Sequence, residues 1–150
     1  MKIERILVAV DGSEHSDRAV ELAGSLATSQ DAAVTVLHVV QDVGTASVPP
    51  GLEEYAALEN VFITERDLRM SAANSIVGRA AKRLSDMGVP DPHTDIAVGA
   101  PAHQIVEAAK RMGADMIVIG SRGLGGVGTL LGSTSHKVSQ SASCTVVTVR

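Results

Sequence analysis

The stretch MIVIGSRGLGGVGTLLGSTS, residues 116–135, holds six of the chain's 14 glycines, all of them between Gly120 and Gly132. An apolar run precedes the glycines, and three hydroxyl-bearing residues follow them. This order predicts a buried strand, a glycine loop and the start of a helix. Glycines let backbone N–H groups approach an anion closely, and a helix N-terminus adds unpaired donors and a positive dipole end. The stretch therefore predicts an anion site of the kind that binds phosphate.

The rest of the chain alternates between strand and helix patterns. Five apolar, largely β-branched runs are typical of strands buried on both faces of a parallel sheet. Between them, apolar residues at spacings of three and four predict helices. The strands are expected over 3–10, 33–40, 94–98, 115–120 and 145–149, and the helices from about 16, over about 64–87, over 101–112 and over 133–142. Residues 41–57, with two prolines and two glycines, predict a long loop.

This alternation predicts one α/β domain over residues 1–150, a three-layer sandwich with helices on both faces of a mainly parallel sheet. Ligands of such sheets bind beyond the C-terminal strand ends, where the strand order reverses. Three segments follow strand ends there: Asp11-Gly12-Ser13, the start of the 41–57 loop, and the glycine loop. If strands one and four flank the reversal, Asp11 and the glycine loop meet.

Composition excludes several classes of function. The net charge is −4, and the 150 residues include one Tyr, one Phe and no Trp. Nucleic-acid binding, which uses basic stripes and stacking rings, is not expected, and a bound base would need an aliphatic slot. No run approaches the roughly 18 apolar residues of a membrane span, and no signal peptide precedes the first strand, so a cytoplasmic protein is expected. The lone Cys144 is expected to be a small buried hydrophobe.

Histidines and carboxylates offer little catalytic chemistry. They form no cluster typical of a protein-built metal site, and no carboxylate near His136 in sequence would orient it as a base. His38 is interpreted as a packed strand-end residue and His103 as solvated, whereas His15 and His93 are expected in polar connections. We therefore assign no catalytic residue. Arg122 is a candidate for screening phosphate charge.

Two familiar phosphate motifs do not explain the glycine loop. The Walker pattern fails because no Lys precedes Thr129 or Ser133. Residues 123–128 match G-x-G-x-x-G, but the dinucleotide fingerprint also needs an acidic residue about 20 positions later, and none follows Asp115. A connection that merely requires small residues stays open as an alternative.

A third motif fits. Gly120-Ser121-Arg122-Gly123, a spacer and then Gly132-Ser133 resemble the G-x2-G-x9-G-[ST] nucleotide motif of the universal stress protein family. The opening strand with its Asp11, the segment 37–39, Gly99-x-Pro101 and the segments 114–115 and 133–147 are similar to that family as well, so the resemblance covers the chain. The spacer 124–131 has eight residues where the family motif has nine, which puts affinity in doubt more than fold.

The resemblance implies a Rossmann-like sheet of order 3-2-1-4-5, a homodimer formed through the last strand, 145–149, and ATP (or AMP/ADP) as ligand. Because no protein-built metal site is predicted, an accompanying Mg²⁺ or Mn²⁺ is expected to be held mainly by the phosphates. It implies that Asp11 contacts the ribose and that Val39 holds adenine through backbone groups. Ala9, Ile119 and Gly120 would wall the nucleoside. The phosphates would contact the backbone N–H groups of Gly123, Gly132, Ser133 and Thr134, and also the Ser133 hydroxyl.

The expected function is that of a stress-response regulatory protein that binds ATP with little or slow turnover. Two alternatives remain. The first is a dimeric scaffold of the same family whose shortened loop has lost ATP. The second is a slow ATP hydrolase or an autophosphorylating enzyme, for which Ser133, Thr134 and Ser135 would be the nearest hydroxyls. The physiological signal and any protein partner are not determined by the sequence.

Overall fold

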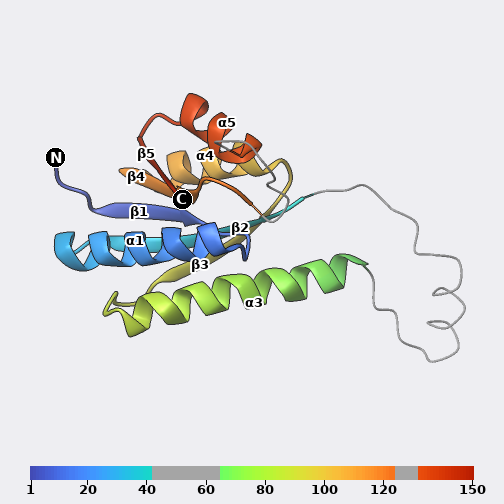
Figure 1. Cartoon of the computed structure of the whole chain (residues 1–150), viewed down its shortest axis with the longest axis horizontal. Helices are drawn as coiled ribbons and strands as arrows, with labels where there is room; N and C mark the ends of the chain where they lie inside the picture. Colours follow the sequence, from blue (N-terminus) through green and yellow to red (C-terminus); the bar gives the residue numbers. More distant parts are fainter. Residues whose placement is uncertain (42–64, 124–131) are drawn as a thin grey trace, which may run out of the picture.

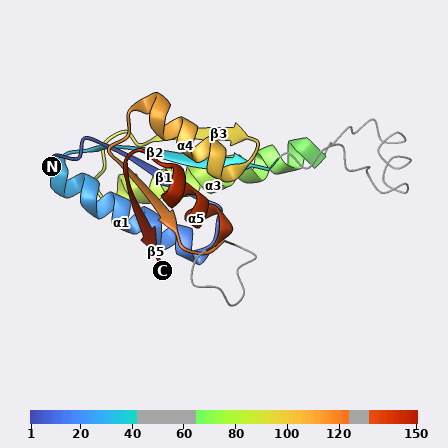
Figure 2. The same cartoon turned by 90° about the horizontal axis from the view of Figure 1, so that it is seen from above.

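Five parallel strands form one sheet in the order β3-β2-β1-β4-β5. The computed structural model describes residues 1–41, 65–123 and 132–150. Figure 2 shows the strands side by side, with β3 and β5 at the two edges. This order confirms the predicted sheet. The strands are β1 (Arg5–Ala9), β2 (Ala33–Val40), β3 (His93–Val98), β4 (Met116–Gly120) and β5 (Thr145–Val149).

Helices cover both faces of the sheet. Figure 1 shows α1 and α3 below it and α4 and α5 above it, which is the predicted three-layer arrangement. Because side chains alternate along a strand, Ile6 and Val8 pack toward α1 and α3, whereas Leu7 packs toward α4 and α5. All three are completely buried, as a strand enclosed on both faces requires. The helices are α1 (Glu14–Gln30), α3 (Glu65–Asp86), α4 (Pro101–Met112) and α5 (Ser133–Ser141).

Most element boundaries agree with the sequence pattern to within two residues. Helix α1 begins at Glu14, earlier than the predicted residue 16, because the Ser13 hydroxyl caps it by accepting from the Ser16 N–H at 3.2 Å. The placement of His15 and His93 in polar connections was wrong, since they lie in α1 and β3. The loop predicted over 41–57 falls, beyond Gln41, outside the described residues, as does the spacer 124–131.

Two further features concern the single cysteine and the apolar character of the helices. Cys144 is half-buried against the core between the sheet, α4 and α5, and this burial raises the pKa of its thiol. Within the described residues, no helix has both the length and the apolar character needed to cross a membrane.

Candidate functional site

A cavity of about 840 Å³ opens at the C-terminal edge of the sheet, over the ends of β1, β2 and β4. The chain leaves β1 for α1 on one face and leaves β4 for α5 on the other, so this edge is the predicted switch point. The cavity brings together every residue proposed from the sequence for the site, namely Ala9, Asp11, Val39, Ile119, Gly120, Arg122, Gly123, Gly132, Ser133 and Thr134.

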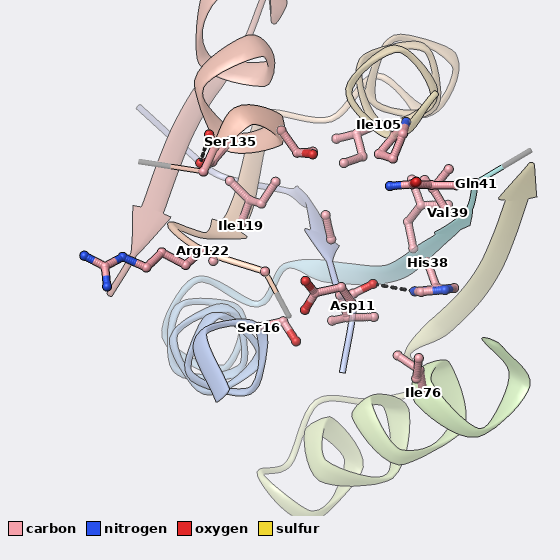
Figure 3. Close-up of a pocket in the computed structure, with 18 of the residues that line it drawn as sticks. Asp11, Ser16, His38, Val39, Gln41, Ile76, Ile105, Ile119, Arg122 and Ser135 are labelled. Carbon is pink, nitrogen blue, oxygen red and sulfur yellow. Dashed lines mark hydrogen bonds between the residues drawn. The ribbon is translucent and has the colours of Figure 1, made fainter. Parts of the chain in front are cut away.

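Asp11 lies two residues beyond the end of β1 and at the centre of the cavity (Figure 3). Its Oδ1 accepts a hydrogen bond from the Ser13 N–H at 2.9 Å, which closes a tight turn, and Gly12 has the left-handed φ of 82° that the turn requires. One carboxylate oxygen therefore holds the turn. The other, Oδ2, is oriented toward Gly123.

An aliphatic slot lies on the α4 and α5 side of the sheet. Figure 3 shows Val39, Ile105 and Ile119 on one side of Asp11, and no aromatic residue lines the cavity within the described part of the chain. The sequence pattern missed Ile105, which is 3% exposed and resembles an ordinary core residue of an amphipathic helix. Its position one turn after Pro101, on the helix that follows a strand's C-terminal end, was the available signal.

The start of α5 supplies backbone donors to the same cavity that have no partner among the described residues. Gly132 is the N-cap residue and makes no side-chain capping bond, and the first intrahelical bond runs from the His136 N–H to the Gly132 carbonyl at 3.0 Å. No hydrogen bond among the described residues uses the N–H groups of Ser133, Thr134 or Ser135, all of which line the cavity. Such a helix start favours an anion.

One expectation for this helix start needs correction. The Gly132 N–H, which the resemblance assigned to a phosphate, instead donates to the Ser121 carbonyl at 2.5 Å. The free donors therefore begin at Ser133.

Each of the three motif glycines lies against other atoms of the protein. A Cβ on Gly120 would lie 2.8 Å from the His15 carbonyl carbon, one on Gly123 would lie 2.6 Å from Asp11 Oδ2, and one on Gly132 would lie 3.0 Å from the Ser121 oxygen. Contacts below 3.0 Å force a shift of one partner. These close approaches explain Gly120 and Gly123 without any ligand.

The charged and imidazole groups near the cavity are either hydrogen-bonded or directed toward solvent. In Figure 3 the Arg122 guanidinium points away from Asp11. His38 Nδ1 lies 2.7 Å from the Val10 carbonyl, so it must carry the proton and donate, which confirms the packed strand-end interpretation. His103, His136 and Lys137 are exposed. No group of three metal-ligating side chains occurs in the described residues.

Helix α3 forms a wall of the cavity that the sequence pattern did not suggest. Arg69, Ala72 and Ile76 line it together with His38 and Gln41. The Arg69 guanidinium donates to the Gln41 carbonyl at 3.2 Å and pairs with Glu65. Since α3 begins only at Glu65, far along the chain from the ends of β1 and β2, no local motif linked these residues to the strand ends.

These features define a doubly wound α/β protein whose cavity at the switch point joins a carboxylate, an aliphatic slot and an open helix start. The chain belongs to the universal stress protein family, whose family model matches residues 2–150. It is a stress-response protein of that family, as its resemblance to the family motif predicted.

Known proteins of the same family agree with this assignment. The chain is 39% identical over 149 residues to universal stress protein YxiE of Bacillus subtilis (strain 168), covering 97% of this chain and 98% of that protein. Universal stress protein UspA from Lactobacillus plantarum superposes with a TM-score of 0.80 at 28% identity, covering 100% and 99% of the two chains. A universal stress protein crystallised in complex with cAMP gives a TM-score of 0.72 at 26% identity, again covering 100% and 99%.

Proposed function

We propose that this protein binds an adenine nucleotide, ATP or one of its products AMP and ADP, in the cavity at the switch point. The observation that carries the proposal is that one cavity joins the Asp11 carboxylate, an aliphatic slot and the unpaired N–H groups of α5. These are an acceptor for ribose hydroxyls, an apolar site for a base and a set of donors for phosphate. The cAMP complex of a related protein supports a nucleotide as the ligand class.

Each part of the nucleotide then has its partners. The base lies among Val39, Ile105 and Ile119, where Val39 offers backbone groups to the adenine edge. Ala9 and Gly120 wall the nucleoside, and Asp11 Oδ2 accepts from the ribose. The phosphates meet the N–H groups of Ser133 and Thr134, with Gly123 at the other rim. Arg122 screens phosphate charge only if its side chain turns toward the cavity, and Mg²⁺ or Mn²⁺ is held mainly by phosphate oxygens.

Ligand identification tests this proposal directly. Natively purified protein is denatured, and the released small molecules are identified by mass spectrometry. Melting is then followed with added ATP, ADP, AMP or cAMP. A ligand at 100 times its dissociation constant stabilises the folded state by about 2.7 kcal/mol, which is readily visible as a raised Tm. Release of no nucleotide together with an unchanged Tm would instead support the scaffold alternative.

Slow turnover is proposed rather than efficient catalysis. The described cavity residues include Asp11 and His38, but Oδ1 of Asp11 holds a turn and Nδ1 of His38 donates to a carbonyl. Neither atom is free to take a proton from an attacking water, and Asp11 Oδ2 is assigned to the ribose, which leaves His38 Nε2 as the one candidate base of these two residues. We expect phosphate release from ATP to stay near the background rate. Fast release, or a phosphorylated hydroxyl on residues 133–135, would favour the enzymatic alternative.

A homodimer formed through β5 is proposed as the assembly. β5 is an edge strand that pairs only with β4 among the described strands, and its Thr145 and Thr148 are exposed. An uncovered edge offers backbone groups to a second copy. Sedimentation of the wild-type protein should give the dimer mass, and Thr148→Lys, which adds a charge to that edge, should shift the equilibrium toward monomer. A monomeric wild-type protein would contradict this assembly.

A further inference from the structure

Ser121 lines the cavity and is hydrogen-bonded to three other segments of the protein. It is 1% exposed, and all of its polar groups are engaged. Its N–H donates to the Val149 carbonyl of β5 at 2.6 Å, and its carbonyl accepts from the Gly132 N–H at 2.5 Å and from the Ser135 hydroxyl at 3.2 Å. Its own hydroxyl lies 3.1 Å from His15 Nδ1. Ser121 therefore joins β5, α5 and α1 at one point.

His15 holds this point from α1. It lies in the first turn of the helix, and its backbone is so close to Gly120 that no Cβ fits there. A second contact, from the Ser13 hydroxyl to the Arg122 carbonyl at 3.4 Å, joins the same two segments. The His15 imidazole adds the only side-chain bond to the Ser121 hydroxyl among the described residues. The first turn of α1 thus fixes the start of the glycine loop.

The connection continues to the helix start that offers its donors to the cavity. Gly132 and Ser135, the two residues held by the Ser121 carbonyl, flank Ser133 and Thr134. The position of the Ser133 and Thr134 N–H groups therefore depends on where Ser121 is held. His15 itself does not line the cavity, so its imidazole acts on a ligand through the bond to Ser121.

We propose that His15, acting through Ser121, is a positioning residue for the phosphate-binding end of the site. The inference rests on the proposed function. It assigns a role to a histidine that the sequence pattern placed in a polar connection. The base and ribose end, formed by Val39, Ile105 and Asp11, has no hydrogen bond to His15 or Ser121 among the described residues and should not depend on them.

Calorimetric titration of wild-type, His15→Ala and His15→Asn proteins with ATP, AMP and adenosine tests the proposal. We expect His15→Ala to weaken ATP and AMP binding about fivefold, the usual effect of one lost hydrogen bond, while adenosine affinity changes by less than about twofold. His15→Asn should restore the part of the affinity that depends on phosphate, because the Asn amide, like the imidazole Nδ1, places a polar atom directly on Cγ. A purely structural role would weaken all three ligands alike.

The outcomes separate this inference from the proposed function. If the wild-type protein binds none of the three ligands, the proposed function fails and the inference fails with it. If the wild-type protein binds ATP more tightly than adenosine and His15→Ala keeps the same ratio, only the inference is overturned. Ser121→Ala removes the same bond from its other partner. The double variant His15→Ala/Ser121→Ala should bind ATP no more weakly than the weaker single variant, and fully additive losses would contradict the proposed chain of contacts.

Discussion

The Asp11 carboxylate occupies the space that a side chain at residue 123 would need, since a Cβ on Gly123 would lie 2.6 Å from Asp11 Oδ2. Gly123→Ala must therefore move the carboxylate or the loop. A shift of the carboxylate displaces the proposed ribose acceptor, and a shift of the loop changes its distance from the phosphate-binding end. We expect this variant to bind ATP at least about tenfold more weakly, which corresponds to the roughly 1.5–3 kcal/mol of a charge-assisted hydrogen bond. Calorimetric titration measures the change.

A double variant shows which group causes that loss. If the new methyl acts by displacing Asp11, then Gly123→Ala/Asp11→Ala should bind ATP about as weakly as Asp11→Ala alone. A double variant that is much weaker than Asp11→Ala would mean that the backbone at Gly123 itself approaches the phosphates. Unchanged affinity of folded Gly123→Ala would remove both residues from the site.

Ser133→Pro should weaken phosphate binding without disturbing the fold. Ser133 is the first helical residue, where proline is well tolerated, and Gly132 before it has the extended backbone (φ −67°, ψ 155°) that proline demands. The substitution removes one proposed phosphate donor. We expect ATP affinity to fall about tenfold with little change in Tm. Ser133→Ala, which keeps the N–H and loses only the hydroxyl, is the matched control, and equal losses in the two variants would assign the contact to the hydroxyl instead.

The short spacer should not limit affinity. Gly132 follows the spacer and Ser121 lies before it, and the Gly132 N–H donates a hydrogen bond to the Ser121 carbonyl. The Ser135 hydroxyl donates a second hydrogen bond to that carbonyl. Inserting one glycine after Gly126 would restore the family's nine residues and change the loop-closure free energy by only about 0.1 kcal/mol. We therefore expect ATP affinity within about twofold of wild type. A tenfold gain on insertion would show that spacer length restrains the helix start.

The sequence predicted the elements of this fold better than their lateral arrangement. Completely buried parallel strands are continuous apolar runs, so Ile6, Leu7 and Val8 were readily assigned. The sheet order, in contrast, depends on contacts between distant segments and came from the family resemblance. At α1 the prediction was two residues late because an Asp-Gly-Ser turn and a Ser N-cap use the same residues.

The residues of the site also fall into those that the sequence indicates and those that only the structure reveals. Asp11 and the glycines have chemistry or backbone freedom that is visible in a single sequence. Ile105 and His15 do not, because an apolar helix residue is usually core and a histidine in a first turn is usually solvated. The proposed role of Ile105 follows from its place in the cavity wall with Val39 and Ile119, and that of His15 follows from its hydrogen bond to Ser121. The resemblance assigned the Gly132 N–H to a phosphate, whereas the structure uses that group inside the protein.

Asp115 should make part of the stability depend on pH. Its Oδ2 accepts hydrogen bonds from the N–H groups of Glu4 and Arg5, each at 2.9 Å. These bonds, of which the one from Glu4 has the larger effect, hold the pKa of the carboxyl below its ordinary value of 3.8. A lowered folded-state pKa means that the stabilisation is complete above the unfolded value and is lost as the pH falls through the folded value. Asp115→Ala should therefore melt at a lower temperature than wild type at pH 7, and the gap should narrow below about pH 4.

Asp115→Asn separates charge from hydrogen bonding in that experiment. Its amide oxygen can still accept from the N–H groups of Glu4 and Arg5 at the start of β1, but it does not titrate. We expect a Tm at pH 7 between those of wild type and Asp115→Ala. The difference in Tm between Asp115→Asn and Asp115→Ala should stay constant as the pH falls. The Tm of the wild-type protein should fall toward the Tm values of both variants. A wild-type advantage over Asp115→Ala that persisted unchanged to pH 2.5 would mean that the carboxylate charge does not stabilise the start of β1.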